Sequence, residues 1–174
     1  MLRRWLPADV GDLADALLGS TDLDRQVPAA ALAGPQGRID VVETMAAWGP
    51  ADHYLAVELD GRVVGTVAAC AVEHRHGTAW ISYWLAEPAR GQGLATRALA
   101  TMAVVAFDEL GLHRLELGHR VDNPASCAVA RRAGFLAEGV EREKLRYGDR
   151  RFDVETHARL RGDPLPLVDL LPVR

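Results

Sequence analysis

The chain has very few cysteines, and this limits the covalent and metal chemistry that the sequence predicts. Cys70 and Cys127 are the two cysteines among 174 residues, the first in a strand-like run and the second in a helix-like run. Two cysteines without close spacing favour neither a disulfide framework nor a zinc site. The pair His74 and His76 is a weak metal signal by itself. We therefore expect no metal cofactor and two buried thiols.

Long apolar runs are also absent. The longest, from Ala98 to Phe107, is too short to cross a bilayer, and Thr101 interrupts it. Pro7 and Asp9 follow the first arginines too closely to leave room for the apolar region of a secretory signal. With 20 Lys and Arg against 24 Asp and Glu, the net charge of −4 favours neither nucleic acid nor an anionic membrane as a partner. We expect a cytoplasmic protein.

The length and the apolar content suit one folded domain. Apolar residues make up 49% and charged residues 25% of the chain, which is average for globular proteins. A chain of this size buries on the order of 70% of its unfolded surface. We expect residues 1–161 to form a single domain. Residues 162–174 contain three prolines and predict an extended tail, which lies on the domain or on another subunit, so a homodimer is a further expectation.

Hydrophobic periodicity predicts alternating strands and helices. We expect strands at 2–5, 54–59, 62–70, 78–85, 114–117, 136–146 and 151–157, and helices at 9–18, 39–48, 94–110 and 124–133. Asp60-Gly61 predicts a tight hairpin between the second and third strands. Glycines and prolines weaken the pattern at 19–50, which predicts irregular cover over the core. Hairpins combined with crossovers predict an α/β fold with a mixed sheet.

The segment from Ile81 to Thr96 is the most informative, because a strand runs into a glycine-containing turn and then a long helix. The first N–H groups of a helix lack partners and attract phosphate, and Arg90 adds positive charge there. Gly91 and Gly93 let the main chain approach a ligand. The spacing fits neither a dinucleotide fingerprint nor a P-loop. A generic nucleotide site and an ordinary strand-to-helix loop remain as alternatives.

Three motifs together resemble those of the GNAT superfamily of N-acetyltransferases, and of its ribosomal-protein N-terminal branch in particular. They are Arg90-x-x-Gly93-x-Ala95, then Asn123-Pro-Ala-Ser126 followed by Gly134-Phe135, and Glu138-Gly139-Val140. The resemblance covers roughly residues 54–160. It implies an α/β (α+β) fold with a seven-stranded, mostly antiparallel sheet that is splayed in the middle and flanked by about four helices.

The same resemblance implies acetyl-CoA as the co-substrate and assigns residues to it. The backbone of Trp84, Leu85 and Ala86 is expected to hydrogen-bond the pantetheine arm and to polarise the thioester carbonyl. The pyrophosphate is expected on the turn, and the far end of the pantetheine on the second motif. The turn residues are Arg90, Gly91, Gln92, Gly93, Leu94, Ala95 and Thr96, and those of the second motif are Asn123 and Ser126.

The reaction expected from the resemblance is transfer of the acetyl group to a primary amine, on a protein N-terminus or a small molecule. Many members of the family use a tyrosine as the general acid where this chain has Ala130, which shifts that role to Ser126. The candidate bases are His119 and Glu116, which lie on or after a strand lining the slot. A CoA-binding domain without catalysis is the alternative. Several aspartates, Asp22 among them, are candidates to attract a cationic amine.

Overall fold

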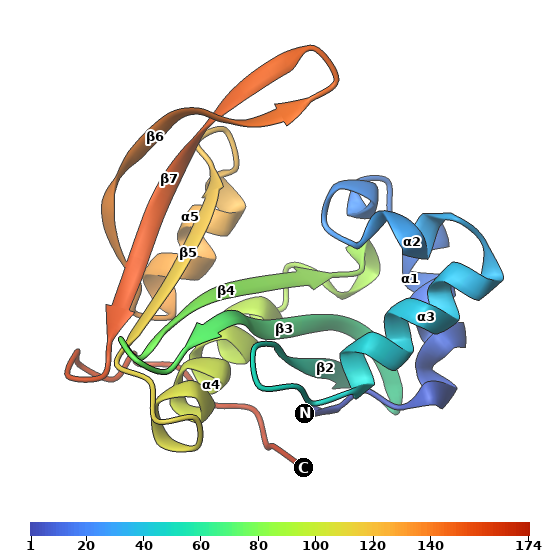
Figure 1. Cartoon of the computed structure of the whole chain (residues 1–174), viewed down its shortest axis with the longest axis horizontal. Coiled ribbons are helices and arrows are strands. Elements are labelled where there is room, and N and C mark those ends of the chain that lie inside the picture. The colour runs from blue at the N-terminus through green and yellow to red at the C-terminus, as the bar shows by residue number, and fades with distance from the viewer.

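Seven strands form one open sheet in the computed structural model, which describes residues 1–174 (Figure 1). Their order across the sheet is β1-β2-β3-β4-β5-β7-β6. The strands are β1 (Leu2–Arg4), β2 (His53–Leu59), β3 (Arg62–Glu73), β4 (Thr78–Leu85), β5 (Arg114–Arg120), β6 (Leu136–Tyr147) and β7 (Arg150–Leu160). The helices are α1 (Val10–Leu18), α2 (Ala29–Leu32), α3 (Pro35–Ala46), α4 (Leu94–Asp108) and α5 (Pro124–Arg132).

The sheet separates between β4 and β5. All neighbouring strands are antiparallel except this pair, which is parallel and joined only at the start of both strands. Pairing runs from Thr78 with Arg114 to Trp80 with Glu116 and then stops. Beyond that point β4 and β5 diverge, and the long β6–β7 hairpin rises past them (Figure 1). The mostly antiparallel, splayed, seven-stranded sheet implied by the resemblance is therefore confirmed.

Local turn chemistry sets the first hairpin of the sheet. Asp60 and Gly61 both have positive φ, 49° and 77°. This is the pattern of a type I′ turn, whose twist matches that of the flanking strands. β2 and β3 pair directly on either side of this turn, and the expected hairpin is confirmed.

Helices cover the two faces of the sheet and divide the core into two clusters. The larger cluster has 23 buried residues and includes one side of α4, among them Leu99 and Met102, packed on the sheet. The smaller cluster has 13 residues and lies between α1, α3 and the opposite face. The buried Trp5 Nε1–H donates to Thr66 Oγ1 at 3.1 Å, so its polar atom has a partner inside this second cluster.

The segment 19–50 differs from the irregular cover that its composition predicts. It contains α2 and α3, and α3 begins at Pro35 rather than Ile39. Pro35 occupies the first turn, where a missing N–H costs nothing. Leu23, Val41 and Val42 are buried against the sheet. Tertiary packing therefore orders short helices whose own propensity is weak.

The C-terminal residues lie extended on the chain's own β1 and α4. Leu2 N–H donates to Pro172 O at 2.7 Å, and Leu171 N–H donates to Thr101 Oγ1 at 2.8 Å. Leu171 is buried, whereas Leu167 is fully exposed. The homodimer stays a prediction. None of the helices is both long and apolar enough to span a bilayer.

Candidate active site

The glycine-containing turn opens α4 with unpartnered N–H groups. Gly91 and Gly93 have φ of 77° and 73°, which glycine adopts at no steric cost. Gly93 is the N-cap of α4, and the first N–H bonded back to it belongs to Arg97, at 3.1 Å. The N–H groups of residues 94–96 therefore have no partner within the helix. An anion placed here meets several donors and the positive end of the helix dipole.

Beside this turn, the end of β4 directs one backbone N–H group into the slot. Ala86 N–H donates to Val64 O at 2.8 Å, on the β3 side. Because backbone groups alternate along a strand, the N–H of Leu85 faces the opposite side, where β5 has diverged. One backbone donor is thus directed into the slot at the point where a thioester carbonyl is expected.

Two cavities of about 460 Å³ each occupy the slot. We call the first the turn-side cavity. Most of the residues predicted to bind acetyl-CoA line it: Trp84, Leu85, Arg90, Gly91, Gly93, Leu94, Ala95, Thr96, Asn123 and Ser126. Ala86 and Gln92 do not line it. The second, the hairpin-side cavity, extends toward Leu145 and Tyr147 of β6.

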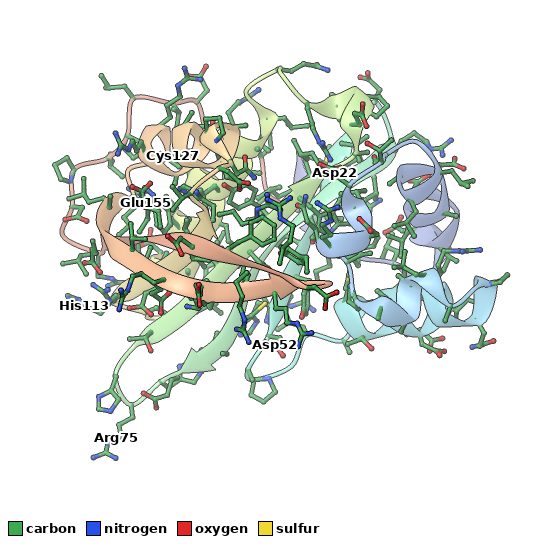
Figure 2. All side chains as sticks on the ribbon, turned by 90° about the horizontal axis from the view of Figure 1, so that it is seen from above. Asp22, Asp52, Arg75, His113, Cys127 and Glu155 are labelled. Atoms are coloured by element: carbon green, nitrogen blue, oxygen red, sulfur yellow. The ribbon has the colours of Figure 1, made fainter.

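Arg90 is held by an aspartate that the sequence reasoning did not connect to the turn. Its two Nη groups donate to Asp22 Oδ2 and Oδ1 at 2.9 and 2.7 Å, and its Nε donates to Leu85 O at 2.9 Å. The hydrogen bonds from Arg90 hold the pKa of Asp22 below its usual range. Asp22 comes from the segment between α1 and α2, and Figure 2 labels it. Both side chains line the turn-side cavity.

Tyr83 and Ser126 lie where the two cavities meet, because both residues line both. Tyr83 Oη is 3.4 Å from Ser126 Oγ and 3.4 Å from Ser126 O. Burial raises the pKa of the Tyr83 hydroxyl, which favours its protonated, donating form. Asn123 Oδ1 accepts the N–H of Ser126 at 3.0 Å, so the expected N-cap of α5 is confirmed. Ala130, in contrast, is fully buried on the side of α5 that packs into the core.

Of the two candidate bases, Glu116 lies outside both cavities. Its carboxylate accepts from Arg114 Nε at 2.7 Å, and Arg114 also pairs with Glu138. Along β5, Glu116 alternates with the buried Leu115 and Leu117. It therefore points away from the face that carries the cavity-lining His119.

His119 lines the hairpin-side cavity, but both of its ring nitrogens have partners. Nδ1 is 2.9 Å from Arg120 O, and Nε2 is 3.0 Å from His157 Nε2 and 3.3 Å from Glu155 Oε2. Cys127 Sγ is 3.3 Å from the same Glu155 oxygen. The neighbouring Cys127 thiol and His157 ring lower the pKa of Glu155.

Several of these neighbours lie far from His119 in the sequence and are not predictable from it. Glu155 and His157 are on β7 and Cys127 is on α5, so their approach to His119 depends on the tertiary fold. Within β7 the spacing of two residues places Glu155 and His157 on one face, which is the one local signal available. The expectation of two buried thiols is wrong, because Cys70 and Cys127 are both partly exposed.

A turn with unpartnered N–H groups, an open strand edge and a hydroxyl pair lie along one slot, an arrangement that suits an acyltransferase. Comparison with known families agrees. Residues 1–136 match the family described as the acetyltransferase (GNAT) domain, and the chain belongs to this family.

Several proteins with a similar sequence or structure are named as acetyltransferases. The ribosomal-protein-serine acetyltransferase of Escherichia coli K12 is 34% identical over 101 residues, 58% of this chain and 56% of the relative. A solved structure of RimL, a ribosomal L7/L12 alpha-N-protein acetyltransferase, in complex with coenzyme A has a TM-score of 0.82 at 24% identity, covering 91% of this chain and 92% of that one. A chimera of the Vibrio cholerae spermidine N-acetyltransferase SpeG reaches 0.77 at 20% identity, with 92% and 96% covered. The chain spans about half the length of the curated relatives it matches.

Proposed function

We propose that the protein transfers the acetyl group of acetyl-CoA to the primary amine of a peptide N-terminus. One observation supports this most directly. The turn-side cavity leads from the glycine-containing turn before α4 to Ser126 and Tyr83, and there it meets the hairpin-side cavity. A pyrophosphate on the turn and a pantetheine along β4 then bring the thioester to the junction, and the amine enters from the other side.

The protein's contribution to the chemistry is alignment and hydrogen bonding. The amine nitrogen attacks the thioester carbonyl, whose oxygen takes up negative charge next to the N–H of Leu85. The C–S bond then breaks, and the CoA thiolate leaves near the hydroxyls of Ser126 and Tyr83. The Tyr83 hydroxyl, whose pKa is raised by partial burial, stays protonated and is suited to donate to the sulfur through or beside Ser126. This pair takes the place of the tyrosine that the family usually carries where this chain has Ala130.

The proton of the amine needs no strong base. A peptide α-amine has a pKa of about 7.7–8.0 and is partly neutral at neutral pH, so water in the hairpin-side cavity suffices as the acceptor. His119 and Glu116 as bases stay predictions. The geometry favours neither, because the ring nitrogens of His119 are engaged and Glu116 is paired with Arg114.

The charges around the hairpin-side cavity favour a peptide over a polyamine. Its two aspartates are both paired with arginines, Asp22 with Arg90 and Asp122 with Arg120. A polycation is attracted by carboxylates that lack such partners. The names of the E. coli relative and of RimL also point to ribosomal-protein acceptors, whereas that of SpeG points to spermidine.

The test is release of free CoA thiol from acetyl-CoA with an array of peptides, and with spermidine and amino sugars as competing acceptors. Ser126→Ala and Tyr83→Phe are each expected to lower kcat by about a hundredfold, the low end of general-acid effects, with the Kd for acetyl-CoA unchanged. Tyr54→Phe is the matched control, because Tyr54 lies on β2 and lines neither cavity.

Three results would count against the proposal in different ways. Acetyl-CoA binding without turnover on any amine supports a CoA-binding module that has lost catalysis. Turnover on spermidine alone removes the peptide assignment. Equal thermal stabilisation by ATP, NAD and CoA supports a generic nucleotide site instead.

A further inference from the structure

Four side chains with metal-binding atoms converge behind the slot, between α5 and the β5–β7 half of the sheet. They are His119 of β5, Cys127 of α5, and Glu155 and His157 of β7. Figure 2 labels Cys127 and Glu155 on neighbouring elements. His119 and Glu155 are direct cross-strand partners, as are Leu117 and His157. All four donor atoms lie within 4.8 Å of one another.

The backbone carbonyls around the two histidines favour the tautomers that carry hydrogen on Nδ1. His119 Nδ1 is 2.9 Å from Arg120 O and His157 Nδ1 is 3.4 Å from Phe135 O. A carbonyl oxygen only accepts, so each Nδ1 is the donor. In the neutral rings each Nε2 then carries a lone pair, and these two atoms face each other at 3.0 Å beside the Glu155 carboxylate. In these neutral tautomers, two lone pairs and a carboxylate face one another with no cation between them.

The distances between the donor atoms suit one small cation. His119 Nε2 and His157 Nε2 are 3.3 and 2.9 Å from Glu155 Oε2, and Cys127 Sγ is 3.3 Å from it. Zinc bonds of about 2.0–2.3 Å to N, O and S in a tetrahedron set neighbouring ligands about 3.3–3.8 Å apart. The four spacings among His119, His157, Glu155 and from Cys127 to Glu155 are 2.9–3.3 Å, and the two spacings from Cys127 to the histidines are within 4.8 Å, so small side-chain shifts would bring all four atoms around one ion. Carbonyl partners on both Nδ1 atoms are the outer contacts that metal-bound histidines usually have.

We propose that His119, Cys127, Glu155 and His157 bind one divalent transition-metal ion of the zinc class. Two imidazoles, one thiolate and one carboxylate form a mixed N, S, O donor set that suits zinc or cobalt better than magnesium or calcium. All four positions around the ion are filled by protein, which is the arrangement of a structural site. On binding, Cys127 loses its thiol proton to solvent and the sulfur becomes a ligand. Glu155 and Cys127 are partly exposed, so an entry path exists.

A metal ion bound by these four residues would link α5 to the sheet. Ser126, the residue before Cys127, borders both cavities. A metal that links Cys127 to β5 and β7 stabilises the helix that carries Ser126 and keeps His119 Nε2 out of proton transfer. This inference is independent of acetyl transfer, because metal binding is measured without CoA or amine.

The experiment is titration of the chelator-treated full-length chain with Co²⁺ and then Zn²⁺. We expect about one ion per chain, the visible absorption of tetrahedral Co²⁺, a thiolate-to-cobalt band in the near ultraviolet, and displacement of Co²⁺ by Zn²⁺. Loss of an outer contact at a metal site already weakens binding about tenfold to a hundredfold. Cys127→Ser, which removes a ligand, is expected to weaken it at least as much and to abolish the thiolate band.

The second cysteine provides the matched control. Cys70→Ser removes the other partly exposed thiol, which lies on β3 outside the cluster. This variant should keep one bound ion per chain, the thiolate band and the rise in Tm with Zn²⁺. Glu155→Gln should reduce the Zn²⁺-dependent rise in Tm while circular dichroism reports a folded chain. The proposal is overturned if the unmodified chain binds no ion stoichiometrically, or if Cys127→Ser and Cys70→Ser bind Co²⁺ with equal affinity and equal spectra.

Discussion

Replacing Asp22 by asparagine is expected to tighten the binding of CoA. Asp22 accepts from both Nη groups of Arg90 at 2.9 and 2.7 Å. These are the donors that a pyrophosphate on the turn would use, so the ligand and the aspartate compete for one guanidinium. The neutral amide would remove the competing charge and also the repulsion between a carboxylate and the phosphates.

The size of the effect follows from the exposure of the pair. The side chains of Arg90 and Asp22 are 36% and 43% exposed. Exposed ion pairs contribute about 0.2–1 kcal/mol, so releasing Arg90 from Asp22 should lower the Kd for CoA by about 1.4-fold to fivefold. Arg90→Gln removes a charge-assisted hydrogen bond worth about 1.5–3 kcal/mol, which raises Kd by about tenfold to a hundredfold. The two substitutions are therefore expected to act in opposite directions.

Isothermal titration calorimetry of CoA with each variant, at low and at physiological salt, measures these changes in Kd. The changes should become smaller as the salt concentration rises. Asp24→Asn is the control, since Asp24 is a neighbouring exposed aspartate that lines neither cavity. Competition between Asp22 and the ligand is ruled out if Asp22→Asn weakens CoA binding as much as Arg90→Gln does. In that case Asp22 positions Arg90 for the ligand instead of competing with it.

Two further predictions concern stability, and urea unfolding tests both. Gly118→Ala places a Cβ 2.7 Å from Val154 Cγ1 and 3.1 Å from the Trp80 ring, and should lower the free energy of unfolding by about 1–3 kcal/mol. Gly139→Ala is the control, because its Cβ meets nothing within 4 Å and should leave the free energy of unfolding unchanged. Equal losses in the two variants would contradict this expectation. Burial lowers the pKa of His53, whose ring nitrogens lack partners, below 6.5. The unfolded chain then binds more protons in mild acid, so stability falls as pH drops through about 6.5. His53→Leu should flatten this dependence between pH 7 and 5, and an unchanged slope would refute the assignment.

The parts of the fold that the sequence predicts are those set by neighbours along the chain. Asp60-Gly61 specifies its own turn through two positive φ angles, and Asn123 caps α5 through a contact three residues away. The turn before α4 is predictable for the same reason, since its glycines and free N–H groups are adjacent in sequence. The splay of the sheet came from family resemblance, because no local pattern records where β4 and β5 separate.

The parts that the sequence does not predict are contacts between distant segments. Asp22 reaches Arg90 across the chain because α1 to α3 pack on the face behind β4. The cluster around His119 draws on β5, α5 and β7, and no spacing rule connects these three elements. Short segments such as α2 owe their helical state to burial, which composition alone does not report.

The position of Ser126 depends on what lies behind α5 more than on the slot in front of it. In front, its one side-chain partner is Tyr83 Oη at 3.4 Å, a long contact that leaves room for a ligand atom. Behind, Ala130 and Phe135 are fully buried, and Arg159 Nη1 donates to Ala133 O at 3.1 Å. Because interiors are close-packed, a change on the buried side moves the helix as a body. Substitutions behind α5 should therefore alter both kcat and the affinity for acetyl-CoA, because α5 carries Ser126 and also lines the turn-side cavity through Ala125, Ala128, Val129 and Arg132.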